Sequence, residues 1–311
     1  TGGRWLEAAG RFIHCRDRIE SITDDSRNVL PNALFVAING EQCDGHDYVS
    51  AAIDNGASAV CIQSDRSTEA KPVCAAAGVP CLVVDDTLSA FQQLACAHRL
   101  RCNDSTVLAI TGSSGKTSTK EMLAAILEVK WPGRILKTEG NTNNHFGVPR
   151  NLFRLKSRHS AAVLELGTNH PGEIAQLTRL VKPDVSVVNN IGPAHLEFFG
   201  DLDGVAREKS AIFSETYEGG TVVLPEDGPG HDILSSAAGK RKKLVFGDSR
   251  RADIRVEYNG RKNNRFAMTL SWPKQSVRRE ILWTTGGAHQ AMNAAAAAAA
   301  ATAVGGAPAD I

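Results

Sequence analysis

The sequence lacks three features that define other classes of protein. No apolar run reaches the roughly 18 residues that a membrane-spanning helix needs. No secretory signal is visible, although the chain begins at Thr1. The formal net charge is only +1, so the chain has no general electrostatic attraction to nucleic acid or to a membrane surface. We therefore expect neither nucleic-acid nor membrane partners.

Cysteines paired at metal-binding spacings are also missing. The cysteines are scattered, and all of them precede Ile110 in the 311-residue chain. Such usage favours reduced, mostly buried thiols over disulfides or a zinc site, and it is typical of a cytoplasmic protein. The seven are Cys15, Cys43, Cys61, Cys74, Cys81, Cys96 and Cys102.

The chain is long enough for about two domains of ~150 residues each. In residues 1–104, short apolar runs alternate with helical stretches, which predicts a small α/β domain. A polar turn at 103–105 is the expected boundary. The expected strands are 33–38, 59–62 and 81–84, and the expected helices are 48–55 and 87–100.

Residues 105–311 predict a second α/β domain of the phosphate-binding-loop type, with a mostly parallel, doubly wound sheet. Ligands of such sheets bind beyond the carboxyl ends of the strands. Between residues 253 and 285, apolar and polar residues alternate along short segments separated by turn residues. This pattern predicts an added antiparallel meander, with Asn259-Gly260 as one of its turns. An alanine-rich helix is expected over 289–304. The parallel strands are expected at 107–111, 135–136, 161–166, 185–188, 221–224 and 244–246.

The stretch that organises this domain is Ile-Thr-Gly-Ser-Ser-Gly-Lys-Thr at 110–117. It joins a β-branched apolar run to a helical stretch, and Gly-Lys-Thr in such a turn is typical of a phosphate-binding loop. Glycine lets backbone N–H groups approach an anion, and the helix N-terminus adds a favourable partial charge. The candidate nucleotide-binding residues are Gly112, Ser113, Ser114, Gly115, Lys116, Thr117 and Ser118.

Two residues carry the expected chemistry of this loop. Lys116 would reach the terminal phosphates of a nucleotide, and the Thr117 hydroxyl would bind Mg²⁺. Ile110 stands where the common pattern has a glycine, so the loop is a short variant that points to a particular subfamily. The alternative is an ordinary Gly/Ser turn that opens a helix.

Polar side chains near the ends of later strands are further candidates for the nucleotide and metal site. Glu165 ends an apolar strand, where a carboxylate is costly to bury unless it meets a cation or a metal. It either ligates Mg²⁺ beside Thr117 or simply becomes exposed to solvent at the end of the strand. His195 follows the next strand, and both a ligand role and a structural role are open. Lys209, on the following helix, would by itself be a solvated surface lysine.

The loop 140–147, Gly-Asn-Thr-Asn-Asn-His-Phe-Gly, is dense in amides. It is either a turn-rich connection or a loop that contacts phosphate or sugar, and neither periodicity nor spacing decides between them. The side-chain amides concerned are those of Asn141, Asn143 and Asn144.

Together these segments resemble the Mur ligase family of peptidoglycan synthesis, and the resemblance covers nearly the whole chain. The phosphate loop marks the family. The amide-rich loop and Leu-Glu-Leu-Gly-Thr-Asn-His at 164–170 favour the branch that adds D-alanyl-D-alanine. The matching segments are 23–27, 34–41, 44–48, 111–122, 140–149, 164–174, 190–197, 204–213 and 287–293.

The resemblance implies a role for each catalytic candidate. Lys116 would bind ATP phosphates, and Thr117 and Glu165 would hold one Mg²⁺. His195 would hold a second Mg²⁺ together with Lys209 carboxylated to a carbamate. That modification turns a cation into an anion, which explains how a lysine could serve a metal site.

The resemblance also implies binding residues for the organic ligands. His289 and Asn293 would contact the adenine, whereas Gln290 stands where relatives usually have Asn. The amides of the 140–147 loop would contribute to substrate binding. The first domain would hold the uridine diphosphate end of the substrate through Ser26, Arg27, Gly40, Asp44, Gly45 and His46.

The reaction implied is ATP- and Mg²⁺-dependent amide ligation. Transfer of the γ-phosphoryl group of ATP to the carboxylate of UDP-N-acetylmuramoyl-tripeptide gives an acyl phosphate, which the amine of D-Ala-D-Ala displaces. Two Mg²⁺ ions and a lysine would offset the charge of bringing a carboxylate to a triphosphate. We expect a cytoplasmic monomer.

Relatives carry a third, Rossmann-like domain that helps bind ATP and the amine, and this sequence ends at Ile311, about where that domain would begin. We therefore expect the third domain to be absent, and the chain alone to bind the UDP-substrate but to ligate poorly or not at all. Two alternatives stay open. One is a sister ligase that adds a single amino acid, including a folylpolyglutamate synthetase-like enzyme; the other is a non-catalytic nucleotide-binding scaffold.

Overall fold

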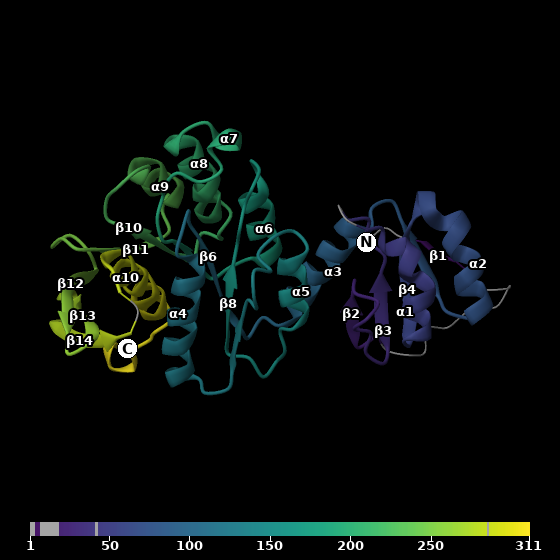
Figure 1. Cartoon of the computed structure of the whole chain (residues 1–311), viewed down its shortest axis with the longest axis horizontal. Coiled ribbons are helices and arrows are strands. Elements are labelled where there is room, and N and C mark those ends of the chain that lie inside the picture. Colours follow the sequence, from purple (N-terminus) through teal and green to yellow (C-terminus); the bar gives the residue numbers. More distant parts are fainter. Residues whose placement is uncertain (1–3, 7–18, 41–42, 285) are drawn as a thin grey trace. The chain divides into compact units, whose positions relative to one another are not determined.

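The computed structural model describes residues 4–6, 19–40, 43–284 and 286–311, which form two compact units, 1–98 and 99–311 (Figure 1). The units part within helix α3 (Thr87–Arg101), a few residues before the polar turn expected as the boundary. Arg99 explains the difference, because this buried side chain donates to the carboxylate of Asp184 at 3.2 Å and to the carbonyl of Val181 at 3.2 Å. The last turn of α3 therefore belongs to the second unit.

The first unit is built on a five-stranded sheet in the order β1-β5-β4-β3-β2. β1 pairs antiparallel with β5, and the other neighbours are parallel. Buried residues of β3, β4, α1 and α2 form its core. The elements are β1 (Arg4–Leu6), β2 (Ser21–Thr23), β3 (Ala33–Val36), α1 (Val49–Asp54), β4 (Ala57–Gln63), α2 (Ser67–Ala77) and β5 (Cys81–Val84).

Local sequence signals explain where several of these elements begin and end. The carboxylate of Asp86 accepts from the backbone N–H groups of Leu88 at 2.9 Å and Ser89 at 3.1 Å, so it caps α3 as expected. Gly56, with a φ of +100°, follows the end of α1. Sequence reasoning missed α2, which contains Pro72 in its interior, a residue that normally ends a helix.

The second unit is built on a nine-stranded sheet in the order β14-β13-β12-β11-β10-β9-β6-β8-β7. The strands from β7 to β12 are parallel, and β12, β13 and β14 form the antiparallel meander. The predicted fold class is confirmed. The strands are β6 (Thr106–Thr111), β7 (Ile135–Lys137), β8 (Ala161–Glu165), β9 (Val185–Val188), β10 (Thr221–Pro225), β11 (Lys242–Gly247), β12 (Ile254–Lys262), β13 (Arg265–Trp272) and β14 (Val277–Trp283).

Helices cover both faces of this sheet. α4 (Lys116–Lys130) and α10 (Ala288–Ala303) pack side by side on one face (Figure 1), and α6 (Glu173–Val181) and α8 (Leu202–Ser214) pack together against β6 and β9. Both faces of the central strands are therefore buried, which explains their nearly continuous apolar sequences. The remaining helices are α5 (Gly147–Phe153), α7 (Leu196–Phe199) and α9 (His231–Ala238). None of the helices in the described part of the chain is long and apolar enough to cross a membrane.

The meander corrects one sequence expectation. Asn259-Gly260 does not form a turn; it lies inside β12, where the register with β13 shifts and Gly260 has a φ of +76°. The chain instead reverses at Asn263 and Asn264, whose φ values are +49° and +60°. Two successive left-handed residues give a turn whose twist matches a β-hairpin, and asparagine tolerates that conformation.

The alanines of α10 give the first prediction. Ala297 is fully buried in the core that α10 shares with α4 and the sheet. Ala297→Leu should lower the free energy of unfolding by about 1–3 kcal/mol, because extra methyl groups in a filled core force neighbouring side chains out of place. Denaturant unfolding measures the change. The exposed Ala125 of α4 is the control, and Ala125→Leu should change stability by less than about 0.5 kcal/mol. Equal effects at the two positions would contradict close packing at α10.

Candidate active site

The phosphate loop runs from Gly112 to Gly115, between β6 and α4. Close contacts require both glycines: a Cβ on Gly112 would lie 1.5 Å from Oδ1 of Asn189, and a Cβ on Gly115 would lie 2.5 Å from Oδ1 of Asn293. Gly115 also has a φ of +73°, where glycine is favoured. The loop therefore packs tightly between the end of β9 and the start of α10.

Lys116 folds back onto this loop. Its Nζ donates to the carbonyl of Gly112 at 2.9 Å. Burial lowers the pKa of Lys116 below its ordinary value, and the nearby carboxylate of Glu165 opposes that shift. A partly desolvated cation at this position would be stabilised by any anion that bound to the loop.

Glu165 is brought to the loop by β8, which pairs in parallel with β6. Its carboxylate accepts from the hydroxyl of Thr117 at 2.9 Å and from the amide of Asn143 at 2.8 Å. Its backbone N–H donates to the hydroxyl of Thr138 at 3.0 Å. The residue is 2% exposed, so it does not surface at the strand end. Two segments distant in the sequence thus converge on one carboxylate.

This arrangement fits a magnesium ion. Thr117 and Glu165 present hard oxygen atoms, and Mg²⁺ usually takes one or two carboxylates and completes its shell with phosphate oxygens and water. In the described residues, no group of three His, Cys, Asp or Glu side chains could hold a metal ion by itself. The protein atoms therefore suit an ion bound jointly with a nucleotide, and Thr117 and Glu165 are the residues that would hold it.

Lys209 and His195 come from different elements. Lys209 lies on α8 and is 3% exposed, so the solvated surface position suggested by its sequence alone is wrong. Burial and the charge of Lys116 lower the pKa of Lys209 to about 8. His195 is exposed just before α7, with its ring edge-on to Phe199 at 6.4 Å. A shared metal at His195 and Lys209 stays a prediction.

Sequence reasoning assigned no role to the asparagines that follow β9. The backbone carbonyl of Asn190 accepts from the N–H of Ser113 at 3.1 Å, and its side-chain oxygen accepts from the N–H of Ser114 at 3.1 Å. The hydroxyl of Ser113 lies 2.9 Å from the carbonyl of Gly192. The available signal was topological, because β9 and β6 are parallel neighbours that end at the same edge of the sheet.

The start of α10 closes the other side of the loop. Asn293 is buried against Gly115, and its Nδ2 donates to Oε1 of Gln290 at 3.2 Å. Gln290 therefore contacts Asn293, which in turn packs against the loop. His289 is exposed, and Ser118 is half-buried in the first turn of α4. Adenine contacts of His289 and Asn293 stay predictions.

The three amides of the 140–147 loop have different positions. Asn143 bridges to Glu165, as described above, and also donates to the side-chain oxygen of Asn141 at 3.1 Å. Asn144 instead caps α5, since its side-chain oxygen accepts from the N–H of Gly147 at 2.9 Å. The loop is therefore both a structured connection and a part of the site.

His46 and Asp44, two predicted substrate-binding residues of the first unit, are hydrogen-bonded to each other. Nδ1 of His46 lies 2.6 Å from the carboxylate of Asp44, and Nε2 accepts from the N–H of Gln63 at 2.9 Å. With Nδ1 donating and Nε2 accepting, both ring nitrogens are engaged, and the His46 side chain is 3% exposed. Asp44 also caps the 3₁₀ helix Gly45–Tyr48. A structural role is shown for both residues, and substrate contact stays a prediction.

The glycines of this loop follow from its backbone path. The N–H of Gly45 donates to the carbonyl of Ile38 at 2.8 Å, and a Cβ on Gly45 would lie 2.6 Å from the nitrogen of Ile38. The N–H of Gly40 donates to the carbonyl of Cys43 at 3.0 Å. Residues 41–42 lie outside the described residues.

Ser26 and Arg27 differ in accessibility. Ser26 is buried, and its carbonyl accepts from the amide of Asn55 at 2.9 Å. The Arg27 side chain is 85% exposed and makes two 2.9 Å bonds to Asp25. The Arg27 guanidinium lowers the pKa of Asp25 to about 2. Arg27 therefore presents its remaining donors to solvent.

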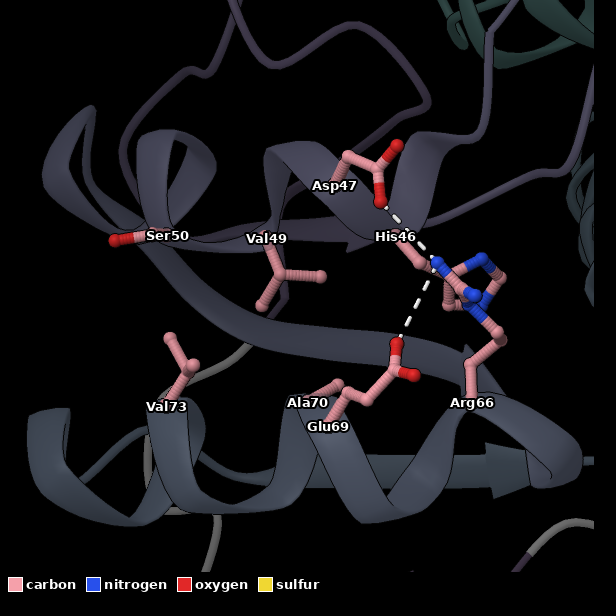
Figure 2. A pocket seen from close by; sticks show the side chains of 8 residues that line it. All are labelled: His46, Asp47, Val49, Ser50, Arg66, Glu69, Ala70 and Val73. Atoms are coloured by element: carbon pink, nitrogen blue, oxygen red, sulfur yellow. Dashed lines mark hydrogen bonds and ion pairs between the residues drawn. The ribbon is translucent and has the colours of Figure 1, made fainter.

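A small pocket of the first unit lies beside His46 (Figure 2). Arg66 reaches into it and pairs with the carboxylates of Asp47 at 3.1 Å and Glu69 at 3.5 Å. The carboxylates around this guanidinium outnumber it, so the pocket offers no net positive charge for a diphosphate. Its other lining residues are Val49, Ser50, Ala70 and Val73.

Two family models match the chain. The Mur ligase family catalytic domain matches residues 18–99, and the Mur ligase middle domain matches residues 110–301, which is more than half of the chain. The chain belongs to the Mur ligase family. The resemblance inferred from its motifs is confirmed.

Known Mur ligases show the extent of the similarity. UDP-N-acetylmuramoyl-tripeptide–D-alanyl-D-alanine ligase of Escherichia coli K12 is 39% identical over 293 residues, which cover 92% of this chain and 61% of that protein. The crystal structure of MurF from Acinetobacter baumannii has a TM-score of 0.84 at 34% identity, covering 95% and 62% of the two chains. MurF from Thermotoga maritima in complex with ADP has a TM-score of 0.78 at 29% identity, covering 93% and 64%. The chain spans less than two thirds of these relatives.

Lys209 gives a pH prediction for this Mur ligase. Its pKa is about 8 in the folded protein and near its ordinary 10.5 when unfolded, so the unfolded chain binds more protons between these values. The free energy of unfolding should therefore rise with pH across this window through Lys209, and Lys209→Met should lose that rise. At lower pH the variant should be at least as stable as the parent, because it buries no charge.

Urea unfolding in carbon dioxide-depleted buffer, at several pH values from about 7 to about 10, tests this prediction. Lys242, exposed in β11, is the control, and Lys242→Met should keep the parent's dependence on pH. A pH dependence that is the same in Lys209→Met and the parent would show that the buried amine does not titrate in this range.

Proposed function

We propose that the chain is the nucleotide- and substrate-binding part of an ATP-dependent ligase that joins D-alanyl-D-alanine to UDP-N-acetylmuramoyl-tripeptide through an acyl phosphate, a step of peptidoglycan precursor synthesis. The observation that carries the proposal is the convergence of Thr117 and Asn143 on buried Glu165 beside the phosphate loop. The activity named for the E. coli relative and the ADP complex of the T. maritima relative support it.

In this proposal the second unit holds ATP. The phosphate loop and Lys116 would bind the phosphates, and His289 and Asn293 would contact the adenine. Thr117 and Glu165 would hold one Mg²⁺, which when bound supplies positive charge to the transferring phosphoryl group. Asn143, tied to Glu165, would link the amide-rich loop to that site and, with Asn141 and Asn144, contact the substrate. Catalysis would then consist mostly of positioning and charge compensation.

Lys209 would act as a carbamate that shares a second Mg²⁺ with His195. Its lowered pKa supports this role, because the neutral amine is the form that reacts with carbon dioxide and a pKa of about 8 makes that form accessible near neutral pH. The buried position would also protect the carbamate from bulk water.

The first unit would bind the uridine diphosphate end of the substrate. Arg27 is the best placed cation among the predicted residues, since its side chain is exposed, while Ser26 and the 40–46 loop would shape the surroundings. We further propose that the chain is cytoplasmic, because ATP and UDP-linked precursors are substrates available in the cytoplasm. We also propose that it is a monomer.

Binding of ADP with Mg²⁺ to the 311-residue chain tests the nucleotide site. Lys116→Ala should weaken binding about 10- to 100-fold, because a hydrogen bond to a charged group contributes about 1.5–3 kcal/mol. Lys242→Ala is the matched control and should bind as the parent does. Titration calorimetry measures all three. An undiminished affinity in Lys116→Ala, or no binding by the parent, would refute the assignment.

The substrate is tested by comparing UDP-N-acetylmuramoyl-tripeptide with the corresponding dipeptide. We expect the chain to bind the tripeptide form more tightly, and to release phosphate from ATP slowly or not at all with D-Ala-D-Ala added. Preference for the dipeptide form would instead indicate the sister ligase that adds the third residue. If the chain binds nucleotide but neither the tripeptide form nor the dipeptide form, the result would favour a non-catalytic nucleotide-binding scaffold.

A further inference from the structure

The side chain of Asn189, at the end of β9, is packed against the phosphate loop. The residue is 3% exposed. Its Nδ2 donates to the carbonyl of Ser114 at 2.7 Å and to the hydroxyl of Thr119 at 3.4 Å. One buried amide therefore joins the tip of the loop to the first turn of α4.

The same side chain fits a notch at the start of the loop. Oδ1 of Asn189 lies 1.5 Å from the place where a Cβ on Gly112 would stand. The carboxamide thus occupies the space left by the missing side chain of Gly112, and the loop is held by shape as well as by hydrogen bonds.

The hydrogen bonds to Ser114 set the direction of a peptide group. The amides of Asn189 and Asn190 both donate to the Ser114 carbonyl, at 2.7 Å and 2.8 Å. In a trans peptide the carbonyl and the following N–H point in opposite directions. Holding this carbonyl toward the asparagines turns the N–H of Gly115 away from them, directly before the first residue of α4. Backbone N–H groups at the start of a helix can donate to a phosphate.

The acceptor half of the Asn189 amide makes no such contact. Oδ1 is buried without a hydrogen-bond partner in the described structure. An unpaired buried acceptor is destabilising, and an apolar side chain of similar size would avoid that penalty. The donor half of the amide is therefore what accounts for a polar residue at this position.

We propose that Asn189 is a positioning residue of the nucleotide site, holding the Ser114–Gly115 peptide so that the N–H of Gly115 faces the phosphates. This inference rests on the proposed ATP-dependent function. Asn189 contacts no reacting atom itself and acts through Ser114 and Gly112.

Two substitutions separate hydrogen bonding from packing. Asn189→Leu keeps the branched outline and the number of heavy atoms but removes the hydrogen-bonding groups, and Asn189→Ala removes both the hydrogen-bonding groups and most of the packing. Ser186→Ala is the control, because Ser186 is a buried polar residue of the same strand whose hydroxyl pairs with Thr216. Thermal unfolding first establishes that each full-length variant is folded at the assay temperature.

The first readout is amide hydrogen exchange of residues 112–119, which does not depend on a ligand. We expect exchange to be about tenfold faster in Asn189→Leu and Asn189→Ala than in the parent, and unchanged in Ser186→Ala. The second readout is ADP binding with Mg²⁺, which should weaken about tenfold in both Asn189 variants. A purely structural role would lower the melting temperature and leave the affinity of the folded protein unchanged.

The outcomes distinguish this inference from the function it rests on. If Lys116→Ala loses ADP while Asn189→Leu binds it like the parent, or if loop exchange is unchanged, the positioning role is wrong and the proposed function stands. If the parent binds no ADP, both are wrong. Faster loop exchange together with weaker ADP binding supports both.

Discussion

The carboxylate of Glu165 is buried, and its need for hydrogen-bond donors and positive charge is the constraint on which the rest of the site depends. A buried carboxylate costs several kcal/mol unless donors and positive charge surround it. Here the donors are the Thr117 hydroxyl and the Asn143 amide, and Lys116 lies close enough to interact electrostatically. Satisfying this one group requires β8 beside β6, α4 directly after the loop, and the amide-rich loop folded over the sheet edge.

The half-buried Lys116 and the buried Lys209 complement this carboxylate. Burial lowers the pKa values of Lys116 and Lys209, and the charge of Lys116 lowers that of Lys209 further. Close cations destabilise each other in a partly desolvated site, and an anionic ligand would relieve that repulsion. The chemistry of a triphosphate therefore matches the electrostatics of this edge, while the asparagines after β9 supply shape and direction without charge.

Much of this could be predicted from local patterns. The apolar strands, the Gly-Lys-Thr turn and the Asp86 cap depend on neighbouring residues, and they occur where expected. Local patterns did not predict features that depend on residues distant in the sequence. Arg99 pairs with Asp184, so it belongs to the second unit and the division between the units falls before it. The hairpin reverses at Asn263-Asn264, whereas Asn259-Gly260 lies at a register shift inside β12. The contribution of Asn189 and Asn190 to the phosphate loop depends on strand order, which spacing along the chain does not specify.

By itself the sequence determined the two α/β units, the phosphate loop and the Mur ligase family, because these depend on periodicity and on short contiguous motifs. Only the tertiary structure decided that Glu165 and Lys209 are buried, that Asn143 reaches Glu165 while Asn144 caps a helix, and that His46 has both ring nitrogens engaged. The physical reason is that burial and hydrogen-bond partners are set by residues far away in the chain, which a local pattern does not contain.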